Sequence, residues 1–98
     1  MASITPEEFK KRLEQEELNI LDIRTPYERD DFSVGGLAIP MDELLLRINE
    51  IPDNWKQKEV IVICGTGMQS AIATRILGKR GFEHPRNLDG GLVAYLGI

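Results

Sequence analysis

The chain has 98 residues, a formal net charge of −4, and hydrophobic and charged fractions of 42% and 29%, which are typical of one soluble globular domain, here residues 1–98. No apolar run approaches the ~20 residues of a membrane span, and no signal peptide is visible. We therefore expect a cytoplasmic protein without a membrane partner. The net negative charge offers no basic stripe that would bind nucleic acid. One cysteine and one histidine exclude an internal disulfide and argue against a metal site, because a structural zinc ion needs more ligands.

The first half of the chain alternates signals for helices and strands. Thr5, Pro6 and Glu8 form a capping box with proline at the first helical position, and Phe9 and Leu13 share one face of the helix that follows. The later signals predict a strand over 19–24, a short polar helix over 27–32, a turn at 35–36, a brief strand over 37–39 and a helix over 41–51.

The second half contains the strongest strand signal, the unalternating run EVIVI over 59–63, which suits a strand buried on both faces of a parallel sheet. A helix over 70–80 follows, with Gly81 as its left-handed cap, and we expect its packing side chains to be Ala71, Ile72, Ile76 and Leu77. A short strand over 87–89 and a helix over 92–96 complete the pattern. Strands that alternate with helices predict an α/β fold with a mainly parallel sheet.

The only cysteine, Cys64, directly follows the strongest strand, at the edge where open α/β sheets bind their ligands. The next helix is expected to begin after Met68, so its free N–H groups and positive dipole end would face the thiol and favour the thiolate. Gly65 and Gly67 suit a backbone that curls around the sulfur with its amides inward. The competing interpretation is a buried cysteine that acts as a small hydrophobe.

With these residues in place, the chain resembles a single-domain rhodanese, a sulfurtransferase-like module, over nearly all of its length. The resemblance rests on the order and spacing of five segments, which are LDIRTPYE (21–28), GGLAIP (35–40), IVICGTGMQSAIATRIL (61–77), GF (81–82) and NLDGGLVAY (87–95). It implies a five-stranded, mainly parallel sheet with helices on both faces.

The resemblance also implies a chemistry. The family's six-residue catalytic loop corresponds to residues 64–69, and Cys64 would be the nucleophile that carries a persulfide. Sulfur would come from a small anion such as thiosulfate or from a protein persulfide, and would pass to cyanide or a thiol without a cofactor. The amides of the loop would hold the charge of the terminal sulfur, and the expected substrate-binding residues are Gly65, Thr66, Gly67, Met68, Gln69 and Ser70. Asp22 and Arg24 would brace the architecture near the loop.

The loop departs from the family pattern at two positions. Many active members carry arginine as the second and sixth loop residues, where this chain has Gly65 and Gln69. Arginine would supply a fixed charge and a bidentate fork, whereas glutamine brings no charge. We therefore expect inefficient use of thiosulfate. In addition, Phe32 replaces a usual histidine, and Tyr95 stands where an aromatic residue, often tryptophan, is expected.

Two other functions compete with sulfur transfer. One is a rhodanese-like binding or regulatory module with little turnover, for which Gly65 and Gln69 leave room. The other is a cysteine phosphatase or arsenate reductase, whose loop runs seven residues from the cysteine to an arginine. Ser70 occupies that last place here, which argues against the second alternative. Ser70 would instead cap the helix or donate a hydrogen bond to the loop.

Overall fold

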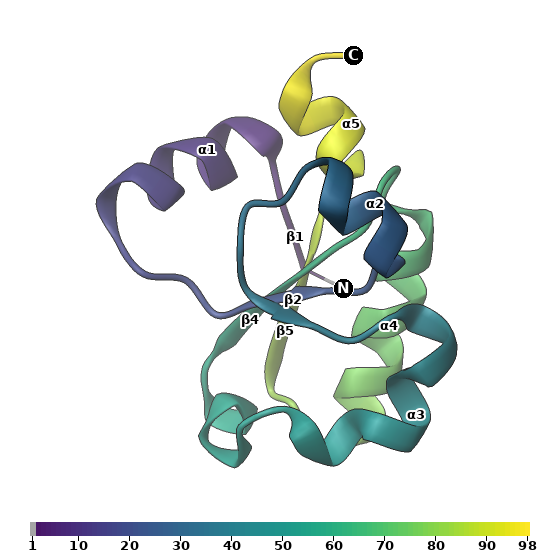
Figure 1. Ribbon diagram of the computed structural model, residues 1–98. Helices are drawn as coiled ribbons and strands as arrows, with labels where there is room; N and C mark the ends of the chain where they lie inside the picture. The colour runs from purple at the N-terminus through teal and green to yellow at the C-terminus, as the bar shows by residue number, and fades with distance from the viewer. Residues whose placement is uncertain (1) are drawn as a thin grey trace.

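The structure, a computed structural model that describes residues 2–98, is built on a five-stranded sheet (Figure 1). The strands lie in the order β1-β5-β4-β2-β3, and each neighbouring pair runs parallel. This arrangement confirms the predicted fold class. The strands are β1 (Ser3–Ile4), β2 (Ile20–Asp22), β3 (Leu37–Ala38), β4 (Glu59–Ile63) and β5 (His84–Leu88).

Helices connect the strands and cover both faces of the sheet. Two of them, α1 and α5, lie over one face, and α3 and α4 lie over the other (Figure 1). Within residues 2–98, no helix is long and apolar enough to cross a membrane. The helices are α1 (Pro6–Gln15), α2 (Pro26–Asp31), α3 (Leu44–Arg47), α4 (Met68–Lys79) and α5 (Gly91–Leu96), with 3-10 turns η1 (Met41–Glu43), η2 (Ile48–Glu50) and η3 (Asp53–Gln57).

Strand β4 is buried on both faces, as its unalternating sequence predicts. Successive side chains of a strand point to opposite faces, and here each face has its own apolar cluster. Val60 and Val62 pack in the cluster that contains Leu77 of α4. Ile61 and Ile63 pack in the cluster beneath α1 and α5. The side chain of each of these four strand residues has no exposed surface, so β4 is the centre of the core and places Cys64 at its carboxyl end.

Strand β1 has no counterpart in the sequence prediction. Ser3 and Ile4 pair with Asn87 and Leu88 of β5, and two residues are too few to show an alternating pattern. The last strand also begins earlier than predicted, at His84, because Pro85 lies inside it and proline normally argues against a strand.

The segment 41–51 does not form the single continuous helix that the sequence predicts. The segment is a short α-helix between two 3-10 turns, a geometry that suits short helical pieces. Leu44 and Ile51 reach the core as expected, but Leu45 is 54% exposed. The prediction for the packing face of α4 was right for Leu77, which is buried, and for Ile76, which packs against the same cluster. It was wrong for Ile72, which is exposed, and Ser70, Ala73 and Thr74 are buried instead.

A carboxylate with two arginine partners joins three elements at the amino end of the sheet, opposite Cys64. Glu59 of β4 accepts hydrogen bonds from Arg12 of α1 at 2.6 Å and from Arg86 of β5 at 2.9 Å. The hydrogen bond from Arg12, followed by that from Arg86, lowers the pKa of Glu59 against the opposing effect of burial. The ionised form of Glu59 therefore stabilises the fold.

Replacing Glu59 by glutamine should lower the free energy of unfolding at neutral pH by about 1 kcal/mol, because the ion pairs are partly exposed to solvent. Since the folded pKa of Glu59 is lowered, its contribution is present above the unfolded pKa and is lost as pH falls through the folded value. Wild type should thus lose stability more steeply than Glu59→Gln between neutral and acidic pH in urea titrations. Glu14→Gln, on the exposed side of α1, is the control, and parallel pH profiles for wild type and Glu59→Gln would contradict the assignment.

Candidate active site

Cys64 lies between the carboxyl end of β4 and the amino end of α4, and its side chain is 3% exposed. Its Sγ accepts hydrogen bonds from the backbone N–H of Gly67 at 3.1 Å and of Ser70 at 3.4 Å. Gly67 is the N-cap of α4 and has φ +90°, a conformation that favours glycine. The sulfur is therefore seated among backbone donors at a helix amino terminus, a setting that stabilises negative charge.

Helix α5 determines which way the loop peptides face. The N–H of Leu92 donates to the carbonyl of Cys64, and the N–H of Val93 donates to the carbonyl of Gly65, both at 2.9 Å. In a planar trans peptide the N–H points opposite to the C=O. The N–H groups of Gly65 and Thr66 are consequently directed away from α5, and neither donates a hydrogen bond to residues 2–98.

Two glycines make this close approach possible. A Cβ on Gly91, which has φ +65°, would lie 2.4 Å from the carbonyl oxygen of Gly65. A Cβ on Gly67 would lie 3.1 Å from the backbone nitrogen of Gly90. The loop and the start of α5 thus meet backbone to backbone, without room for side chains between them.

Ser70 contacts the sulfur from inside α4. It does not cap the helix, because Gly67 is the N-cap, so that alternative was wrong. Its buried hydroxyl lies 3.3 Å from Sγ and accepts a hydrogen bond from the thiol, and it donates a hydrogen bond to Oδ1 of Asn87. Asn87 belongs to the segment 87–95 that carried the family resemblance, but no pattern in the sequence indicates its contact with Ser70.

The pair Asp22–Arg24 braces the neighbouring strand end. Arg24 donates to Asp22 through Nε at 3.1 Å and through Nη2 at 2.8 Å, and also binds the carbonyl of Phe32 at 2.8 Å. Asp22 is 1% exposed and Arg24 is 7% exposed. The guanidinium charge is therefore matched by a buried carboxylate, and the pair ties the end of α2 to β2.

Glu28 brings a carboxylate to the loop. Its Oε1 accepts from the backbone N–H of Thr25 at 3.1 Å, and Thr25 in turn accepts from the backbone N–H of Glu28, which completes a capping box for α2. Its Oε2 lies 3.9 Å from the position that a Cβ on Gly65 would occupy. Glu28 was not among the predicted site residues, although the T-P-x-E pattern of residues 25–28 matches the one at Thr5.

A hollow of about 450 Å³ opens beside Cys64. We call it the cysteine pocket. Met68 and Gln69 of its lining are exposed, and Thr66 is exposed beside them, so the loop side chains form its rim while the backbone forms its floor. The full lining is Arg24, Thr25, Glu28, Cys64, Gly65, Thr66, Met68 and Gln69.

Two residues that depart from the family pattern support the apolar core. Phe32 is half-buried against the cluster beneath α1 and α5. Tyr95 packs edge-on against Phe9, with ring centroids 5.6 Å apart and planes at 70°. Within residues 2–98, no group of three histidine, cysteine or acidic side chains is placed to hold a metal ion.

Comparison with known proteins gives consistent matches. A family model described as a rhodanese-like domain matches residues 5–97. A protein of Bacillus subtilis (strain 168) named as a sulfur carrier is 34% identical, over 96% of this chain and 50% of that protein. A sulfurtransferase of Allochromatium vinosum is 33% identical, over 94% of this chain and 85% of that protein. The crystal structure of a rhodanese-like domain protein from Staphylococcus aureus has a TM-score of 0.84 at 30% identity, over 97% of this chain and 91% of that chain. The chain thus spans half the length of the first relative.

Replacing Gly67 by alanine should destabilise the protein by about 1–2 kcal/mol through its positive φ, and should also alter the alkylation rate of Cys64. Gly35→Ala is the matched control, because Gly35 also has φ +90° but has open space around it. Both variants should lose stability in urea titrations. Only Gly67→Ala should change the rate at which iodoacetamide modifies Cys64, and equal rates in the two variants would show that the loop tolerates a side chain there.

Proposed function

The chain belongs to the rhodanese-like domain family, and we propose that it is a sulfurtransferase that carries sulfane sulfur as a persulfide on Cys64. The observation that carries the proposal is the environment of Sγ, which accepts hydrogen bonds from two backbone N–H groups at the amino end of α4. Backbone donors aimed at a sulfur stabilise it as an anion without a side-chain cation. A cysteine that only filled space in the core would need no such donors.

The first step loads the sulfur. The Cys64 thiolate attacks the outer sulfur of a donor such as thiosulfate, an S–S bond forms to Sγ, and the bond between the two donor sulfurs breaks. Its electron pair leaves with sulfite. The side chain of Cys64 therefore keeps one negative charge, which now lies on the terminal sulfur. Within residues 2–98 the N–H groups of Gly65 and Thr66 have no acceptor, and they are directed away from α5. These groups and the first-turn amides of α4 are the donors available to that sulfur.

The second step returns the thiolate. A nucleophile such as cyanide or a thiolate attacks the terminal sulfur, the S–S bond to Sγ breaks, and the electron pair stays on Cys64. Ser70 supports both steps as a positioning residue. Its hydroxyl lies between Sγ and Asn87, so it can accept a hydrogen bond from the resting thiol or turn to donate one to the thiolate.

Cys64→Ser should abolish thiocyanate formation from thiosulfate and cyanide, and should also abolish the mass gain of one sulfur atom after treatment with a donor. The serine oxygen is a poor nucleophile without a base, and the variant retains no thiol because Cys64 is the only cysteine. Circular dichroism checks that the fold is intact. Turnover by this variant equal to wild type would refute the enzyme proposal and leave a binding module.

The lack of loop arginines should make thiosulfate a poor donor. Gln69 lies on the rim of the cysteine pocket together with Glu28, so an arginine at position 69 would have a carboxylate to hold it. One charge-assisted hydrogen bond contributes about 1.5–3 kcal/mol, so Gln69→Arg should raise kcat/KM for thiosulfate by about ten- to a hundredfold.

Steady-state assays at low and high salt should show this gain shrink as salt screens the new charge. Gln57→Arg is the matched control, because it adds the same charge on the exposed turn η3 at the other end of β4. The charge argument is wrong if wild type is already fast with thiosulfate and arginine at position 69 changes nothing.

A further inference from the structure

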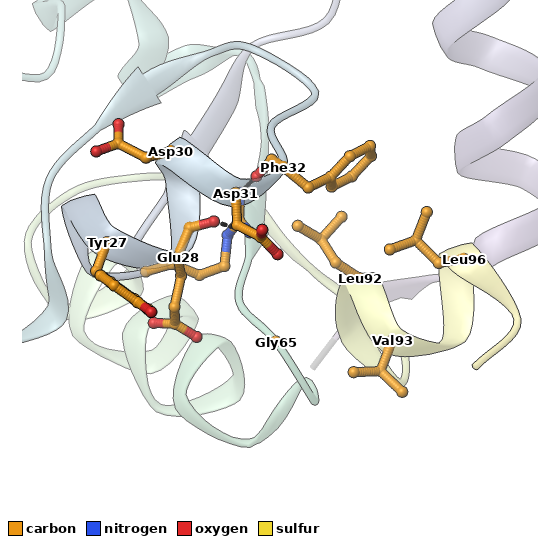
Figure 2. A pocket seen from close by; sticks show the side chains of 10 residues that line it. Tyr27, Glu28, Asp30, Asp31, Phe32, Gly65, Leu92, Val93 and Leu96 are labelled. Carbon is orange, nitrogen blue, oxygen red and sulfur yellow. Dashed lines mark hydrogen bonds between the residues drawn. The ribbon is translucent and has the colours of Figure 1, made fainter.

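A second hollow of about 590 Å³ adjoins the cysteine pocket, between α2 and α5. We call it the α2–α5 cleft. It shares three lining residues with the cysteine pocket, which are Arg24, Glu28 and Gly65. Whatever occupies the cleft is therefore next to the loop that holds the sulfur (Figure 2).

One wall of the cleft is apolar. Leu92, Val93 and Leu96 contribute it from α5, and the ring of Phe32 points toward them from the end of α2 (Figure 2). Val93 is 39% exposed and Leu96 is 45% exposed. A small inorganic anion would gain nothing from this wall, whereas an apolar side chain would bury it.

The opposite wall is acidic. Glu28, Asp30 and Asp31 of α2 line it. The carboxylate of Asp31 is directed toward α5, whereas that of Asp30 points away (Figure 2), and Oε2 of Glu28 lies over Gly65. Within residues 2–98, the side chains of Asp30 and Asp31 have no hydrogen bond and no ion pair. The only cation in the lining, Arg24, is paired with buried Asp22.

The negative charges of the acidic wall disfavour an anionic sulfur substrate and favour a cationic one. Uncompensated carboxylates repel a dianion such as thiosulfate, and they attract a cation. An apolar wall beside a carboxylate wall complements a segment that carries both basic and apolar side chains. A free small molecule offers such a pair of features less readily than a stretch of polypeptide.

We propose that the α2–α5 cleft docks a cysteine-bearing segment of a partner protein with basic and apolar side chains beside the cysteine, and that this partner exchanges sulfur with Cys64. This inference rests on the proposed function and names its partner class. In the exchange, the partner's thiolate attacks the terminal sulfur of the Cys64 persulfide. The S–S bond to Sγ breaks, its electron pair stays on Cys64, and the partner becomes the persulfide.

The test uses short peptides as acceptors. Cys64 is loaded with inorganic polysulfide, the excess is removed, and transfer is followed by mass spectrometry. Three peptides of equal length carry a cysteine flanked by lysine and leucine, by glutamate and leucine, or by lysine and serine. Mercaptoethanol, a neutral small thiol, gives the reference rate for every protein variant.

At low salt the lysine–leucine peptide should accept sulfur about five- to thirtyfold faster than the glutamate–leucine peptide, because attraction to the carboxylate wall replaces repulsion. High salt should reduce the ratio, and the lysine–serine peptide should be slower than the lysine–leucine peptide. Equal rates for the lysine and glutamate peptides would overturn the proposal.

Substitutions in the α2–α5 cleft test whether the peptide preferences arise there. Relative to the mercaptoethanol rate, Asp31→Asn should reduce the preference for lysine over glutamate, and Leu96→Ser should reduce the preference for leucine over serine. Glu14→Gln on α1 removes a carboxylate that is also exposed but lies outside the cleft, and it should keep both preferences. Preferences that persist unchanged in Asp31→Asn and Leu96→Ser would overturn the proposal.

Two further outcomes separate the causes of failure. If Cys64 never loads, or never transfers sulfur to mercaptoethanol, the proposed function fails before the cleft is tested, and the inference falls with it. Transfer to peptides could instead be inhibited as protein concentration rises, with the protein dimeric by sedimentation. A second copy of the chain would then cover the cleft, and the proposal of a separate partner protein would be overturned.

Discussion

The loop that holds Cys64 depends on one contact, the packing of the first turn of α5 against the backbone of residues 64–67. The amides of Leu92 and Val93 bind the carbonyls of the loop, and Gly91 leaves no space for a side chain at the interface. Because peptide groups are planar, carbonyls held by α5 turn the next amides to the opposite side. The donors for a sulfur anion are thus oriented by a helix that lies much later in the sequence, and the loop needs no charged side chain of its own to present them.

The rest of the site follows from the parallel sheet. Asp22 and Cys64 stand at the carboxyl ends of adjacent strands, since Asp22 pairs with Ile63, and Asn87 lies beside Val62 in the next strand. These three side chains therefore lie near the carboxyl edge of the sheet, where parallel strands bind ligands. Asp22 neutralises Arg24, and Asn87 orients Ser70. The cation nearest the loop is therefore used to brace the fold, while the carboxylates of α2 stay unmatched. We propose that this balance of charge favours a basic, apolar protein segment over thiosulfate as the substrate.

The features that the sequence predicted are those that depend on neighbours along the chain. The run EVIVI, the glycines around Cys64 and the alternation of helix and strand are local patterns, and they predicted the α/β class and the place of Cys64. The features that it missed are contacts between distant segments. The pairing of β1 with β5, the hydroxyl of Ser70 beside Asn87 and the carboxylate of Glu28 over Gly65 each join residues whose types are common on any surface. Only the folded chain shows that these segments meet, and that Ser70 and Glu28 do so at the loop that holds Cys64.

We propose that the folded loop makes Cys64 a carrier of sulfane sulfur. The most direct measurement is mass spectrometry of protein treated with inorganic polysulfide, freed of excess donor and then kept either folded or unfolded in urea. We expect one added sulfur on the peptide that contains Cys64, retained while the protein is folded and lost faster once the backbone donors of Gly67 and Ser70 are dispersed. No sulfur on Cys64 of the folded protein, or equal rates of loss in the two states, would contradict the claim.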